Sequence, residues 1–75
     1  MRDISVREDG IRLGQFLKLA DLADTGADAK ALLEDGAVTV NGRPESRRGR
    51  QLVAGDVVHV PLADPVRVCT ANGSP

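Results

Sequence analysis

Aromatic residues are almost absent from this sequence. Phe16 is the one aromatic side chain in 75 residues, and the chain contains no Trp or Tyr. Proteins that hold single-stranded nucleic acid by stacking its bases need several aromatic side chains to form the stacking platform. The composition therefore argues against recognition by base stacking.

Cysteine and histidine are equally scarce. Cys69 has no second cysteine for an intramolecular disulfide, and His59 is the single histidine, so the Cys and His spacing of a zinc site is missing. His59 lies between two valines with no nearby serine or cysteine to act with, so no catalytic role is expected for it. We predict no metal, no cofactor and no enzymatic activity.

Long apolar runs are also lacking. No stretch approaches the roughly 20 apolar residues that span a bilayer, and the first six residues, Met1 to Val6, lack the apolar run of a signal peptide. We therefore expect a cytoplasmic protein without a membrane partner, and a monomer. A chain of 75 residues allows one domain with a modest core, which leaves little room for an active site and its supporting residues.

The formal net charge is −1, but the charges are unevenly distributed. Residues 13–36 contain two lysines and five acidic residues. Residues 43–50 contain four arginines, and Glu45 is the one acidic residue among them. A local basic surface is therefore expected on a molecule that has no overall attraction for nucleic acid.

Apolar periodicity predicts two short helices. The spacing of Leu13, Phe16, Leu17 and Ala20 is that of an amphipathic helix. A second helix is expected between Thr25 and residue 36. The Thr25 hydroxyl can cap its start by accepting a hydrogen bond from the backbone N–H of residue 28, and residue 36 is a glycine suited to a left-handed cap at its end.

Strand patterns flank these helices. Ile4 and Val6 alternate with polar residues, and residues 38–40 lead into Asn41-Gly42, a strong signal for a hairpin turn. Residues 57–60 are expected to form the last strand of a domain of residues 1–63, followed by a flexible tail of residues 64–75. The alternative is that residues 66–68 add a further strand. The predicted fold class is α+β in two layers.

Five segments, taken in order, resemble the S4 RNA-binding domain family, and most closely the small bacterial proteins in which this domain stands alone. They are Leu13-Gly-Gln-Phe-Leu-Lys18, Thr25-Gly-Ala-Asp-Ala-Lys30, Gly36-Ala-Val-Thr-Val-Asn-Gly42, Arg47-Arg-Gly-Arg50 and Gly55-Asp-Val-Val58. The resemblance implies an S4-like domain of the αL-motif type, with two helices packed on a small twisted, mainly antiparallel sheet and a basic concave face for structured RNA, ribosomal RNA in particular. Ala27 and Gln51 depart from the pattern, because relatives often carry a glycine and a basic residue there.

The resemblance also implies which residues contact RNA. These are Lys18, Thr25, Gly26, Lys30, Asn41, Arg43, Arg47, Arg48 and Arg50. A helix start can hold a phosphate with its unpaired N–H groups, and arginine forks can make two parallel hydrogen bonds to one phosphate. Such contacts suit double-stranded RNA, which is recognised by its shape and backbone.

Simpler interpretations of the same residues stay open. Thr25 and Asp28 can be a helix cap and nothing more, and Lys18 can pair with Asp21 on the helix surface. The arginines can pair with the nearby acids, Glu45 and Asp56, and Asn41 can serve only the turn.

Two other classes of function also compete. One is a protein-protein adaptor whose arginine segment meets an acidic partner. The other is a sulfur carrier of the β-grasp type, suggested by the pattern Leu-x-x-Gly-Asp-x-Val at residues 52–58, although this chain ends in Asn-Gly-Ser-Pro where carriers need Gly-Gly. A pseudouridine synthase is not expected, because its catalytic domain has no space in this chain.

Overall fold

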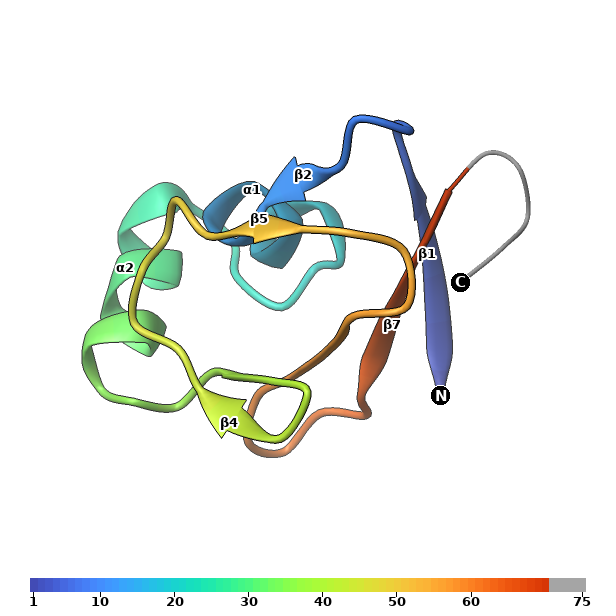
Figure 1. Ribbon diagram of the computed structural model, residues 1–75. Helices are drawn as coiled ribbons and strands as arrows, with labels where there is room; N and C mark the ends of the chain where they lie inside the picture. The colour runs from blue at the N-terminus through green and yellow to red at the C-terminus, as the bar shows by residue number, and fades with distance from the viewer. Residues whose placement is uncertain (71–75) are drawn as a thin grey trace.

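The computed structural model describes residues 1–70, which form two helices, a five-stranded sheet and a separate pair of short strands (Figure 1). The elements, in chain order, are β1 (Arg2–Val6), β2 (Ile11–Arg12), α1 (Leu13–Leu19), α2 (Gly26–Glu34), β3 (Thr39–Val40), β4 (Arg43–Pro44), β5 (Gln51–Leu52), β6 (Val57–His59) and β7 (Val66–Thr70). Among these residues no helix is long and apolar enough to cross a membrane.

The larger sheet has the strand order β1-β7-β6-β3-β4. Strands β1 and β7 are parallel, and the other three pairings are antiparallel. Strands β2 and β5 form the second, antiparallel pair. The predicted α+β class with a mainly antiparallel sheet is confirmed.

The first helix buries the predicted stripe. Leu13, Phe16, Leu17 and Ala20 are all buried in the core, whereas Lys18 lies on the exposed side of the helix. Phe16 and its neighbours pack with valines of the sheet in one hydrophobic cluster. The 3.6-residue period therefore predicted both the helix and its orientation.

The second helix is capped at both ends as expected. The Thr25 hydroxyl accepts a hydrogen bond from the backbone N–H of Asp28 at 3.1 Å. At the other end Gly36 has a φ of 70°, which a residue without a Cβ adopts at low cost, and its N–H donates to the carbonyl of Leu33. The capping interpretation of Thr25 and Asp28 is therefore confirmed as at least part of their role.

The predicted hairpin turn is also present. Asn41 and Gly42 have φ values of 54° and 84°, the left-handed conformations that a tight two-residue turn between antiparallel strands requires. Strands β3 and β4 pair across this turn, and Pro44 lies in β4 at the edge of the sheet, where its missing N–H costs no ladder hydrogen bond.

The expected domain boundary at residue 63 is wrong. Residues 66–70 form β7, which pairs with β1 on one side and β6 on the other, and Val66 and Val68 are fully buried. Strand β6 is therefore not the last strand, and residues 64–70 belong to the domain. The rest of the expected tail, residues 71–75, lies outside the described residues.

Candidate nucleic-acid interface

The basic segment between β4 and β5 lies beside the start of α1 (Figure 1), and backbone hydrogen bonds join the two. The carbonyls of Arg50 and Arg48 accept hydrogen bonds from the N–H groups of Leu13 and Gly14 at 2.8 and 2.9 Å. The first N–H groups of a helix have no partner inside the helix, so these bonds satisfy donors that the helix itself cannot. We call residues 45–50 the arginine loop.

Arg48 extends from the start of one helix to the start of the other. A Cβ placed on Gly14 would lie 3.3 Å from the Cβ of Arg48, and one placed on Gly26 would lie 3.9 Å from its Nη2. Gly14 thus lets the arginine pass close to α1, and the guanidinium group reaches the amino end of α2. Within residues 1–70 Arg48 forms no ion pair.

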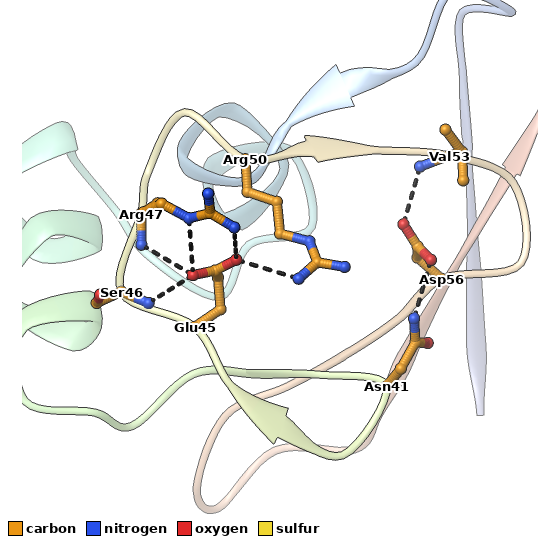
Figure 2. A network of polar contacts seen from close by, with 7 residues as sticks. All are labelled: Asn41, Glu45, Ser46, Arg47, Arg50, Val53 and Asp56. Atoms are coloured by element: carbon orange, nitrogen blue, oxygen red, sulfur yellow. Dashed lines mark hydrogen bonds and ion pairs between the residues drawn. The ribbon is translucent and has the colours of Figure 1, made fainter.

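The other two arginines of the arginine loop converge on one carboxylate (Figure 2). Glu45 accepts hydrogen bonds from Nε and Nη2 of Arg47 at 3.4 and 3.2 Å and from Nη1 of Arg50 at 3.1 Å. Its Oε2 also accepts from the backbone N–H groups of Ser46 and Arg47, at 3.0 and 3.3 Å. The Glu45 side chain is 9% exposed, whereas that of Arg47 is 76% exposed.

This network sets the charge state of Glu45. The hydrogen bonds from Arg47, and then from Arg50, stabilise the ionised carboxylate and lower the pKa of Glu45 from 4.5 to about 2, against the opposing effect of its burial. The same contact raises the pKa of Arg47 above its ordinary value. Glu45 is therefore a fixed negative charge at neutral pH.

A separate network at the hairpin turn engages Asn41 (Figure 2). Its side-chain N–H donates to Asp56 at 3.0 Å, and its side-chain oxygen accepts from the N–H of Val57 at 2.9 Å. Asp56 also accepts from the N–H of Val53 at 2.9 Å. The Asn41 side chain therefore connects the turn to the start of β6, a structural role in addition to the predicted turn.

With this geometry in place, comparison with known proteins identifies the family. The sequence pattern of the S4 domain family matches residues 4–69 of this chain. The chain belongs to the S4 domain family. The probable ribosome maturation protein RlbA of Bacillus subtilis is similar to it, with 51% identity over 57 residues that cover 76% of this chain and 80% of RlbA.

The S4 domain brings only part of the predicted site residues together. Arg48 meets the start of α2 at Gly26, and Arg47 and Arg50 share the arginine loop with it. Lys30 forms an ion pair with Glu34, its neighbour one turn along α2, at 3.8 Å. Like the other residues predicted to contact RNA, these four cations and Gly26 stay predictions.

Of the remaining predicted contacts, Thr25 adjoins Gly26 at the start of α2, whereas Lys18, Asn41 and Arg43 lie on other elements. Lys18 is exposed in the last turn of α1, and the ion pair with Asp21 that was its alternative interpretation is not seen within the described part of the chain. Arg43 is exposed in β4 and forms no ion pair with any of residues 1–70. The interpretation that the arginines pair with nearby acids is confirmed for Glu45, which pairs with Arg47 and Arg50. It is wrong for Asp56, which pairs with none of the described arginines.

Two residues of this region were not predicted from the sequence. Arg12, the residue before α1, donates from Nη1 to the carbonyl of Gly49 at 3.3 Å and so adds another cation beside the arginine loop. Gly14 provides the close approach for Arg48. Only a contact map could have found them, because each acts on residues more than 30 positions away. Among residues 1–70 no group of three His, Cys, Asp or Glu side chains could hold a metal ion.

Proposed function

We propose that this protein is a non-catalytic RNA-binding module that recognises structured RNA, with ribosomal RNA as its target. The observation that carries the proposal is the position of Arg48, whose side chain runs from Gly14 at the start of α1 to Gly26 at the start of α2. An arginine fork and the unpaired N–H groups of a helix start are both groups that bind phosphate, and here they lie together.

The recognition we propose uses the RNA backbone and shape. The arginine loop adds two further guanidinium groups beside Arg48, and no aromatic side chain accompanies them. Double-stranded RNA offers phosphates, 2′-hydroxyl groups and a regular shape, which such a surface can recognise without reading base edges. The similarity to a probable ribosome maturation protein supports ribosomal RNA as the target, and hence a cytoplasmic location.

The experiment is to crosslink the protein to RNA in cells and to sequence what copurifies. The wild-type protein is compared with a variant in which Arg47, Arg48 and Arg50 are all alanine, after circular dichroism has shown that both are folded. We expect ribosomal RNA with the wild type and a large loss of yield with the variant. Recovery of the same RNA at the same yield from both proteins contradicts the proposal.

The same material also tests the adaptor alternative. If the arginine loop bound an acidic protein, proteins captured by the wild type would stay bound after nuclease treatment. We expect captured ribosomal proteins to be released by nuclease instead. Membership in the S4 domain family leaves the sulfur-carrier interpretation without a supporting observation.

A further inference from the structure

Glu45 is an unusual residue for a basic surface. It is the one polar or charged residue among residues 1–70 that is buried in the fold, with 8% of its surface exposed. Burial of a carboxylate is unfavourable unless hydrogen bonds replace the lost water. Glu45 receives five, all from residues of the arginine loop itself.

These bonds leave most of the arginine donors unused. A guanidinium group has five N–H donors. Glu45 takes two from Arg47, through Nε and Nη2, and one from Arg50, through Nη1. The carboxylate is buried while Arg47 is largely exposed, so the unused donors of Arg47 face solvent, where a phosphate can reach them.

We propose that Glu45 is a positioning residue that holds Arg47 and Arg50 in the orientation in which their outer N–H groups receive RNA phosphates. This inference rests on the proposed function. A long arginine side chain loses much rotational freedom when it binds a phosphate with two parallel bonds. Glu45 imposes that loss during folding, so less of it remains to oppose RNA binding.

The opposite role for Glu45 would be that of an internal competitor that occupies the arginines until RNA displaces it. The geometry argues against this role. Displacement would remove the three guanidinium hydrogen bonds and leave a buried carboxylate with only the backbone N–H groups of Ser46 and Arg47, a state that is strongly unfavourable. A phosphate that binds the outer donors requires no such rearrangement.

The two roles predict opposite results for Glu45→Gln. The matched control is Glu8→Gln, because Glu8 is exposed and forms no ion pair within the described residues, and both changes remove one negative charge. The probes are a synthetic RNA hairpin of about 16 base pairs, the length of duplex that a small double-strand-binding domain can span, and a single-stranded poly(U) of equal nucleotide number. Affinities are measured by fluorescence anisotropy at one fixed salt concentration.

Positioning predicts that Glu45→Gln binds the hairpin about tenfold more weakly than Glu8→Gln does. Poly(U), which is held mainly by charge, should bind both variants equally. In NMR spectra, the Nε–H signal of Arg47 should be resolved in the wild type and in Glu8→Gln, and should move to the position of free arginine in Glu45→Gln. Equal hairpin affinity of the two variants, or tighter binding by Glu45→Gln, overturns the proposal.

A second variant covers the case in which Glu45→Gln does not fold. Glu45→Asp keeps the charge but draws the carboxylate back by one methylene, and its hairpin affinity should fall below that of the wild type; equal affinity overturns the proposal. The failure of the proposed function looks different. If the proposed function is wrong, the wild type binds the hairpin no better than the variant in which Arg47, Arg48 and Arg50 are alanine. The proposal for Glu45 then fails together with the proposed function.

Discussion

The turn before β2 offers a test of the fold that holds the arginine loop. Gly10 has a φ of 87°, and a Cβ placed on it would lie 2.4 Å from the backbone oxygen of Leu52 and 2.5 Å from the side-chain nitrogen of Gln51. The Gln51 side chain can rotate away, but the oxygen of Leu52 belongs to β5, which pairs with β2. Gly10→Ala therefore forces the two strands apart.

The magnitude follows from two contributions. An L-residue in a left-handed conformation costs about 1 kcal/mol or somewhat more, and disruption of a strand hydrogen bond adds about 1 to 2 kcal/mol. We expect Gly10→Ala to lower the free energy of unfolding by about 2 to 3 kcal/mol. For a chain of 75 residues the whole free energy of unfolding is about 4 to 11 kcal/mol, so the effect is large.

Gly36→Ala is the matched control. Gly36 also has a positive φ, of 70°, but a Cβ there would meet no atom within 4 Å. It should therefore show only the conformational cost of about 1 kcal/mol. Urea unfolding followed by circular dichroism measures both variants. If the two lose the same stability to within about 0.5 kcal/mol, a typical uncertainty of such measurements, the predicted clash with β5 is refuted.

Three further predictions concern the interface, the core and acid stability. Arg48→Ala should reduce the log-log salt slope of RNA binding by about 0.7 to 0.9, and Arg7→Ala should leave the slope unchanged. Val68→Ala should cost about 2 to 3 kcal/mol in urea unfolding, while Val53→Ala, at an exposed position, should cost almost nothing. Below pH 4.5 the unfolded chain binds a proton at Glu45 before the folded chain does, because folding lowers the pKa of this carboxyl to about 2. Wild-type stability should therefore fall from about pH 5 toward pH 2, and less steeply in Glu45→Gln.

Local features were predictable because their causes lie within a few residues. The stripe that begins at Leu13, the cap at Thr25 and the turn at Asn41 each depend on side chains that act on the backbone one turn away. Each of them was confirmed. Together they fixed both helices and the hairpin, and the order of the motifs indicated the family.

The sequence predicted a tail where strand β7 lies, because the partner of this strand is at the other end of the chain. Val66 and Val68 alternate with Arg67 and Cys69, but so short a pattern is also common in tails. What makes it a strand is the parallel register with β1, where Arg2 lies opposite Val66, and the burial of its valines. A pairing across more than 60 residues leaves no local signal.

The candidate site was predictable as a composition but not as a geometry. Four arginines in eight residues indicated a basic surface. The sequence could not indicate that Arg48 reaches Gly26, because that depends on the hydrogen bond that the N–H of Gly14 donates to the carbonyl of Arg48. Glu45 was expected as a partner of the arginines, but its burial depends on how the loop folds over it.

The net charge of −1 is compatible with a phosphate-binding surface, because the charge that acts at contact is local. Residues 43–50 carry four arginines and one glutamate, a formal charge of +3, so the rest of the chain carries −4. The molecule measures 33 × 20 × 20 Å, whereas screening at physiological salt acts over about 8 Å. Carboxylates farther than this from the arginine loop therefore weaken long-range attraction of RNA, but they have little effect on a phosphate already touching the loop. On the role proposed for Glu45, affinity depends on the orientation of Arg47 and Arg50, the two cations that the buried carboxylate contacts.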